Sequence, residues 1–196
     1  MTIGCIQYGA NVAINISQLK AYSISLPLNG KQSLNIRGEH YQSDQSNGLI
    51  VSNNDFQDLF IDKDCKKLQV VIPEQSMQLV LSDLLNHPVH ESIIFNPNMD
   101  LALDQMIGAW WSNIQNFMLV KSQYTDFYGL RMFSEDYENF LIKALLLSQE
   151  NNFSEALRNS SSQEVPLFIR NVKKFMIDHA HEMLSIEMIL RVAGVS

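Results

Sequence analysis

The sequence predicts an α+β protein in which an antiparallel β-sandwich or barrel is followed by helices. Before Pro73, short segments alternate apolar and polar residues with period 2, and turn residues separate them. After Pro73, apolar residues recur at the spacing of a helix face. The gaps between the early segments leave no room for the crossover helices that parallel strands require, so the strands are expected to be antiparallel.

The composition of the 196-residue chain is that of a globular protein, with 46% hydrophobic and 18% charged residues. Its net charge of −7 argues against a chain that binds a polyanion over most of its surface. No apolar run approaches the roughly 18 residues that span a bilayer, and the N-terminus does not resemble a secretory signal. Cys5 and Cys65 are too few for a disulfide framework. We therefore expect a cytoplasmic protein with reduced thiols and no membrane partner.

The region before Pro73 contains six candidate strands. They are Val12–Ile16, Tyr22–Leu26, Ser33–Arg37, Leu49–Val51, Phe56–Ile61 and Leu68–Ile72. Asn29-Gly30 follows the second of these and is typical of the turn of a β-hairpin. These features predict a sheet structure built from short neighbouring strands.

The region after Pro73 predicts three helices and one further strand. Pro73 suits the start of the first helix, which is expected to end near His87. A short strand at Ile93–Phe95 is expected to return to the sheet. The second helix has one apolar face, formed by Leu103, Met106, Ile107, Trp110, Ile114, Phe117 and Met118. Trp111 is a candidate for core packing or for contact with a partner subunit, and Ser134 is placed to cap the third helix.

The segment 165–196 predicts two helices and the turn after the second. Pro166 is expected to open a helix that runs to about His181. Ser185 is placed to cap a short helix, Gly194 to end it, and Ser196 to cap a third. A short helix, a turn that contains glycine and a serine at the next helix start together describe the first half of a helix-turn-helix.

This C-terminal segment resembles the opening of the AraC/XylS-type DNA-binding domain. The matching positions are Leu184, Ser185, Glu187, Ile189, Ala193, Gly194, Val195 and Ser196. Leu190 departs from the family, which usually has alanine at that position. The resemblance implies that the chain stops at the cap of the recognition helix, before the residues that would read DNA bases.

The region from Tyr22 to Phe95 resembles the cupin-like sensor domain of one branch of these regulators. The matching segments, here and further along the chain, are Pro27–Gly30, Gly38–Asp44, Ile72-Pro73, Phe95–Asp100 and Asn151–Ser154. Their order and spacing span most of the chain. The resemblance implies a cupin-like sensor barrel at 1–95, a helical dimerisation region at 96–150, a linker at 151–164 and an incomplete DNA-binding domain at 165–196.

Because many cupins are metalloenzymes, a catalytic site is the first alternative. Such sites need several histidine and carboxylate ligands that converge on one metal ion. His40 is the only histidine on the expected barrel, whereas His179 and His181 would point apart on a helix. Nucleophile motifs and phosphate-binding glycine loops are absent from the sequence. We predict no catalytic residue, no metal and no cofactor; a cupin-type enzyme and a structural dimerisation module that senses nothing remain the alternatives.

An effector site is expected inside the barrel if one end of the barrel is open. Alternate positions of two strands would then line an apolar pocket: Tyr22, Ile24, Leu26, Leu34 and Ile36. Arg37 and His40 would be placed to bind a carboxylate. The same apolar residues could instead fill the core, and the two polar residues could lie on the surface. The resemblance implies a small organic effector, with aromatic carboxylates as one class.

The resulting hypothesis is the effector-sensing and dimerisation part of a bacterial AraC-family transcriptional regulator. A homodimer would match two DNA half-sites. Leu141 and Leu145 are the candidate dimer residues, although they could instead be buried within one subunit. The effector would change how the C-terminal domain binds promoter DNA. That domain would start at 165–196, which carries a net charge of +1 whereas the rest of the chain carries −8.

Overall fold

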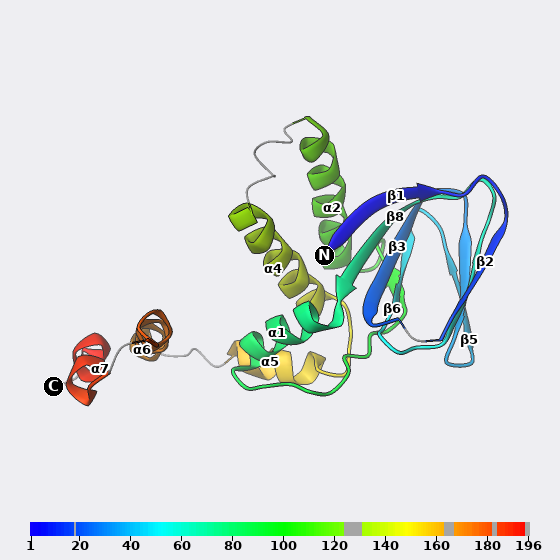
Figure 1. Ribbon diagram of the computed structural model, residues 1–196. Coiled ribbons are helices and arrows are strands. Elements are labelled where there is room, and N and C mark those ends of the chain that lie inside the picture. The colour runs from blue at the N-terminus through cyan, green and yellow to red at the C-terminus, as the bar shows by residue number, and fades with distance from the viewer. Residues whose placement is uncertain (18, 124–130, 163–166, 182–183, 195–196) are drawn as a thin grey trace. The chain divides into compact units, whose positions relative to one another are not determined.

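The computed structural model describes the chain apart from residues 18, 124–130, 163–166, 182–183 and 195–196. The described residues form two compact units, Met1–Leu157 and Arg158–Ser196. The first unit contains two β-sheets and several helices, and the second contains a pair of helices (Figure 1).

Two antiparallel sheets make up the β part of the first unit. Their strands are β1 (Thr2–Gln7), β2 (Val12–Ile16), β3 (Ala21–Asn29), β4 (Gln32–Ile36), β5 (Glu39–Ser43), β6 (Asn47–Val51), β7 (Gln57–Ile61), β8 (Lys66–Pro73) and β9 (Asn98–Asp100). The first sheet has the order β1-β8-β3-β6-β9, and the second has the order β2-β7-β4-β5. The antiparallel arrangement expected from the sequence is therefore confirmed.

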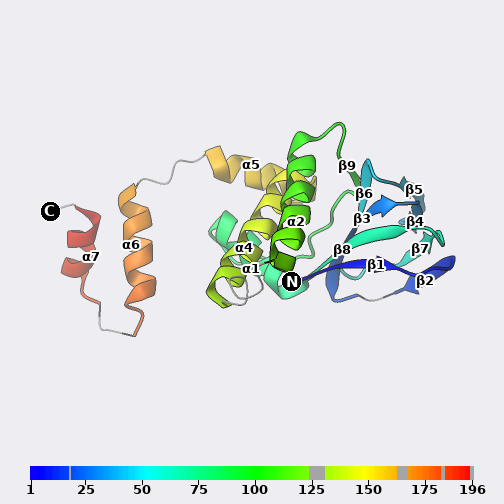
Figure 2. The same ribbon diagram turned by 90° about the horizontal axis from the view of Figure 1, so that it is seen from above.

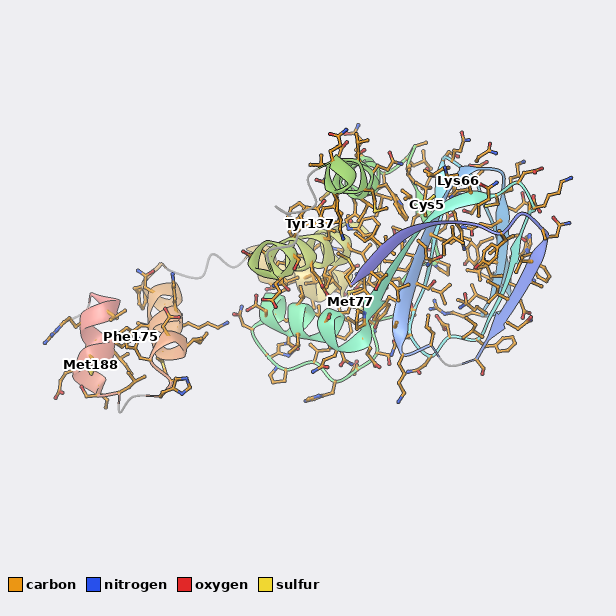
Figure 3. All side chains as sticks on the ribbon, turned by 45° about the horizontal axis from the view of Figure 1, so that its top comes forward. Cys5, Lys66, Met77, Tyr137, Phe175 and Met188 are labelled. Carbon is orange, nitrogen blue, oxygen red and sulfur yellow. The ribbon has the colours of Figure 1, made fainter. Side chains whose placement is uncertain are left out.

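The helices of the first unit lie on one side of the β structure (Figure 1). They are α1 (Glu74–Leu85), α2 (Gln105–Gln123), α4 (Arg131–Ser148) and the start of α5 (Ser154–Ser162). α1 ends where Asn86 adopts a left-handed φ of 58°, and α2 and α4 pack against each other (Figure 2). Met77 of α1 is fully buried in the core that these helices share with the first sheet (Figure 3).

The two faces of the first sheet pack against different parts of the protein. Tyr22, Ile24 and Leu26 of β3 point to the helices and belong to the larger apolar core. The alternate residues Ser23 and Ser25 lie on the other face, which is turned to the second sheet. A smaller apolar core fills the space between the two sheets. Its buried members are Leu34, Ile36, Leu49, Val51, Leu59, Ile61 and Cys65.

The turn at Asn29-Gly30 differs from the hairpin that its sequence predicts. β3 pairs with β6 and β8, whereas β4 pairs with β5 and β7, so the turn carries the chain from one sheet to the other. Gly30 has a φ of +71°, and a Cβ there would lie 2.7 Å from the Cα of Cys65. Glycine is therefore required by the close approach of two backbones.

The strand expected at Ile93–Phe95 is also corrected. The returning strand is β9 at Asn98–Asp100, which pairs with β6. Phe95 makes only an isolated bridge to Asn151. The backbone groups of Phe95 are engaged by side chains, since its N–H donates to Ser52 Oγ and its carbonyl accepts from Arg37. β1 and β5 were not expected, because edge strands with many polar residues lack a clear apolar alternation.

The apolar face predicted for α2 is confirmed in part. Ile107, Trp110 and Ile114 are buried in the larger core. Leu103 and Met106, which were expected on the same face, are 86% and 60% exposed. Trp111 is buried within its own subunit, so the alternative of a partner contact is wrong.

The second unit contains α6 (Leu167–Asp178) and α7 (Ile186–Ala193), which pack on each other. The hydroxyl of Ser185 accepts a hydrogen bond from the backbone N–H of Met188 and caps α7. Gly194 ends α7 with a φ of 69°. Both local predictions are confirmed, whereas Pro166 and Ser196 lie outside the described residues. None of the helices that the structure describes is long and apolar enough to cross a membrane.

Candidate functional site

Tyr22, Ile24 and Leu26 do not line the space between the sheets. They are completely or almost completely buried against the helices. The Tyr22 hydroxyl accepts a hydrogen bond from the N–H of Ile93, and its ring meets the ring of Phe95 edge-on at 5.6 Å. Burial raises the pKa of this hydroxyl. The apolar side of β3 packs against the apolar faces of the helices, because burying these surfaces together removes both from water.

Arg37 and His40 are near the β4–β5 turn but do not converge on a shared site. Arg37 pairs with the carboxylate of Asp55 and also donates to the carbonyl of Phe95 at 3.0 Å. His40 is exposed, and its Nδ1 lies 2.6 Å from Oδ1 of Asn35, its neighbour across the sheet. Both side chains are engaged with the protein, so neither is presented to the interior between the sheets.

A polar cluster inside the sandwich was missed by the sequence analysis. The amine of Lys67 on β8 donates to Oε1 of Gln32 on β4 at 3.1 Å. The amide nitrogen of Gln32 donates in turn to the hydroxyls of Ser25 at 2.8 Å and Ser43 at 3.1 Å. All four side chains are buried, and together they form what is called here the Lys67 cluster.

The cation of this cluster has no carboxylate partner among the described residues. Lys67 is only 2% exposed, and its hydrogen-bond acceptor is the neutral amide of Gln32. Burial lowers the pKa of Lys67 from its ordinary value of 10.5 to about 8. Burial also raises the pKa of the nearby Cys65 thiol, an effect that Lys67 partly offsets. An ammonium group buried without a counter-ion is well suited to bind an anion.

A surface hollow of about 430 Å³ lies at the same end of the sandwich. Its lining residues are Gly30, Lys31, Asp44, Gln45 and Ser46. Two of them directly adjoin members of the Lys67 cluster in the chain, since Lys31 precedes Gln32 and Asp44 follows Ser43. The volume is in the range of sites for small organic molecules. The hollow and the cluster together are the candidate effector site.

One sequence signal for this site was available. On β3, Ser23 and Ser25 alternate with apolar residues, and on β8 Lys67 and Gln69 do the same. The amide of Gln69 also donates to the hydroxyl of Ser23 at 2.9 Å. The alternation shows that one face of each strand is polar, but it does not show that this face is covered by a second sheet.

The predicted dimer residues lie within α4, and the described residues of the predicted helix-turn-helix lie at α7. Leu141 and Leu145 of α4 are both 0% exposed in the larger core, which is the internal alternative that the sequence left open. Ser185, Glu187, Ile189 and Ala193 lie at or within α7, and Gly194 follows it. Ser196 lies outside the described residues. No group of three or more metal-ligating side chains is found in the part of the chain that the structure describes.

The family comparison covers most of the first unit. A family model described as an AraC-binding-like domain matches residues 1–146. A search of curated proteins found no match.

Similar solved structures include the AraC-like transcriptional activator CuxR, at 8% identity and a TM-score of 0.50. The alignment covers 95% of this chain and 64% of CuxR. ToxT from Vibrio cholerae aligns at 8% identity and a TM-score of 0.42, over 99% of this chain and 68% of its own. A cupin protein from Bacteroides fragilis aligns at 20% identity and a TM-score of 0.29, over 36% of this chain and 62% of its own. At these identities the likeness to CuxR concerns the fold alone.

Proposed function

Because the chain belongs to the AraC-binding-like domain family, the effector-binding domains of AraC-family transcriptional regulators, we propose that its first unit binds a small organic effector that controls promoter binding. The family match covers residues 1–146, and the family consists of regulator domains and not of enzymes. The protein would act in the cytoplasm as a homodimer. Binding would shift it between two arrangements that present the DNA-binding domains differently.

The effector is proposed to be a small organic acid, and aromatic carboxylates belong to this class. The observation that carries this proposal is the buried Lys67 amine, whose acceptor in the protein is a neutral amide. A bound carboxylate would supply the missing counter-ion and accept the unused N–H donors of the ammonium group. One solved ToxT structure is described as bound to an unsaturated fatty acid. The acid group proposed here is inferred from Lys67 and not from that likeness.

The surroundings of Lys67 suit the rest of such a molecule. The hydroxyl of Ser25, which accepts from Gln32, can donate to an acid group next to Lys67. The hydroxyl of Ser43 donates to the carbonyl of Asn47, and both amide hydrogens of Gln32 donate within the cluster. Leu34, together with the other members of the smaller core, offers apolar contact for a hydrocarbon part. The hollow beside Lys31 and Asp44 supports entry from this end.

The binding experiment compares the wild type with two lysine variants. Melting temperatures are measured with a panel of benzoate, salicylate and medium-chain fatty acids, each beside its neutral methyl ester. At least one acid is expected to raise the melting temperature of the wild type and of Lys66→Met, which alters an exposed neighbour (Figure 3). The same acid should have little effect on Lys67→Met. Equal stabilisation of Lys67→Met, equal stabilisation by the ester, or no stabilisation by any acid would contradict the proposed effector class.

The proposed dimer surface is the exposed face of α2. From Gln105 to Val120 this helix contains no charged residue, although the chain carries a net charge of −7. Its exposed positions include Met106, Ala109 and Asn116. Depletion of charge is typical of interface centres, and it removes the repulsion between two acidic copies. Leu141 and Leu145 would support this face from inside the subunit.

The segment 165–196 is proposed to begin the DNA-binding domain. α7 has the capping serine and the terminal glycine that the resemblance requires. α6 carries an apolar hollow of about 560 Å³, lined by Ile169, Val172, Met176 and neighbouring residues. An apolar surface of this kind is suited to cover by further helices of the same domain. The sensor at 1–95, the helical region at 96–150 and the linker at 151–164 complete the proposed organisation, with α5 inside the linker.

A further inference from the structure

The segment Ser92–Asn98, called here the 92–98 strap, is held on one side by the two sheets. The N–H of Phe95 donates to Ser52 Oγ at 2.9 Å, and its carbonyl accepts from the Arg37 guanidinium at 3.0 Å. The N–H of Ile50 donates to the carbonyl of Pro97 at 2.9 Å. The strap is therefore attached to β6, to the residue after β6 and to the β4–β5 turn.

The opposite side of the strap is held by the junction between α4 and α5. The N–H of Asn96 donates to the carbonyl of Glu150 at 2.9 Å, and the side-chain amide of Gln149 donates to the carbonyl of Asn96 at 2.8 Å. Asn152 exchanges two bonds with Ile94: its N–H donates to the Ile94 carbonyl at 3.1 Å, and its Oδ1 accepts from the Ile94 N–H at 2.8 Å. The two segments that resemble the regulator family, Phe95–Asp100 and Asn151–Ser154, therefore lie next to each other.

The turn that carries Arg37 is held by tertiary contacts. Arg37 has a φ of +52° and Gly38 a φ of +81°, which makes a two-residue turn between β4 and β5. A left-handed φ is unusual for arginine and requires support from its surroundings. That support comes from Asp55, Ser52 and the carbonyl of Phe95, all of which accept from the guanidinium.

The β4–β5 hairpin has the Lys67 cluster at its other end. Gln32 of β4 is paired with Ser43 of β5, and both belong to the cluster. Ile36 is paired with Glu39 at the turn end. β4 runs without interruption from Gln32 to Ile36, paired with β5 on one edge and with β7 on the other, so a displacement of Gln32 along this strand would reach Arg37.

We propose that the β4–β5 hairpin and the 92–98 strap couple the Lys67 cluster to the start of α5, with Arg37 as the positioning residue. The coupling rests on the proposed function, because the bound acid accepts the unused N–H groups of Lys67 and draws its amine away from Gln32. Gln32 then changes its contacts, the hairpin shifts, and Arg37 changes its hold on Phe95. The strap transmits this change to Asn152, from where α5 continues along the chain into the second unit.

A double-mutant cycle on the whole ligand-free chain tests the coupling. Arg37→Met and Asn152→Ala remove contacts on opposite sides of the strap, and no hydrogen bond joins these two residues directly. The measurement is the hydrogen-exchange rate of the Leu157 amide in α5, which donates to the carbonyl of Phe153 at 2.9 Å. Each single variant is expected to speed this exchange several-fold. The double variant should fall short of the product of the two effects by at least threefold.

Two further variants separate positioning from simple damage. Arg37→Lys retains a cationic donor and should restore part of the protection at Leu157. Lys63→Met changes an exposed cation between β7 and β8, outside the candidate effector site and the strap. It should leave the exchange rate at Leu157 unchanged, alone or combined with Asn152→Ala. If Arg37→Met does not fold, Asp55→Asn takes its place in the cycle. Fully multiplicative effects, or a change that stops at Phe95 without reaching Leu157, would overturn the coupling.

The outcome is separable from that of the effector proposal, because the cycle needs no ligand. If the double-mutant cycle shows coupling but no acid of the panel binds, the proposal for the strap stands and the proposal of an organic acid fails. If an acid binds but the effects of the two substitutions are additive, the proposed effector class stands and the coupling through the strap fails.

Discussion

The amine of Lys67 lies 3.1 Å from Oε1 of Gln32, and this pair joins the two sheets across the interior of the sandwich. An ammonium group in such a position loses its hydration and gains only one neutral acceptor in return. Burial of this kind costs stability unless a counter-ion is added. The pair therefore predicts that Lys67 is a destabilising residue in the ligand-free protein.

The stability of the protein should depend on pH through Lys67. The unfolded chain holds a proton on this amine up to pH 10.5, whereas the folded chain releases it near pH 8. The unfolded state therefore binds more protons between these values, so this residue makes stability rise with pH across that window. Below pH 8 Lys67 is charged in both the folded and the unfolded state, so the cost of burying the charge lowers the free energy of unfolding in full. A pKa shift of this size corresponds to about 3 kcal/mol. Lys67→Met should be more stable than the wild type at pH 7.

Urea unfolding between pH 7 and 10.5 measures this effect. The advantage of Lys67→Met over the wild type should shrink as the pH rises from 8 and be smallest near pH 10.5. Lys66→Met serves as the control, since that residue is exposed and its difference from the wild type should stay flat. A Lys67→Met variant that is less stable than the wild type at pH 7 would show that the amine is compensated within the protein.

Gly48 should not tolerate a side chain. A Cβ at this position of β6 would lie 3.1 Å from Nε1 of Trp111 and 3.2 Å from the carbonyl of Ser25. Trp111 is buried and the carbonyl belongs to a neighbouring strand, so neither can move freely. Gly48→Ala is expected to lower the free energy of unfolding by about 1–3 kcal/mol through overpacking.

Gly108→Ala is the matched control for Gly48→Ala. It lies within α2, and its nearest neighbour would be the carbonyl of Leu101 at the ordinary contact distance of 3.4 Å. Alanine favours a helix over glycine by about 1 kcal/mol, so this variant should be neutral or more stable. Chemical denaturation of both variants decides the matter: equal losses would mean that contact with Trp111 is not the cause.

The dimer proposal predicts opposite results for two glutamate substitutions. Ala109→Glu places a charge on the exposed face of α2 and should give folded monomers. Leu145→Glu places the charge in the larger core, where the side chain is fully buried, and should unfold the protein. Sedimentation gives the oligomeric state and circular dichroism gives the folded fraction. A folded Ala109→Glu dimer would place the interface elsewhere.

The local features of the chain were predictable from its sequence because neighbouring residues produce them. Ser185 caps α7 through the N–H of Met188, three residues away, and Gly194 ends the helix through its own backbone conformation. The α2 helix follows from its apolar spacing. The same reasoning failed at Asn29-Gly30, because a turn sequence does not state which strands its flanking segments will join.

The sequence by itself determined the antiparallel α+β architecture, the resemblance to a regulator family and the ends of α7, since periodicity and capping act over a few residues. The cap expected at Ser134 is wrong, because this residue lies inside α4. The tertiary structure alone decided which face of β3 meets the helices. A period of two defines two faces but does not say what covers each. It also decided the candidate effector site, because Lys67 and Gln32 are 35 residues apart and become partners only when the two sheets close over them.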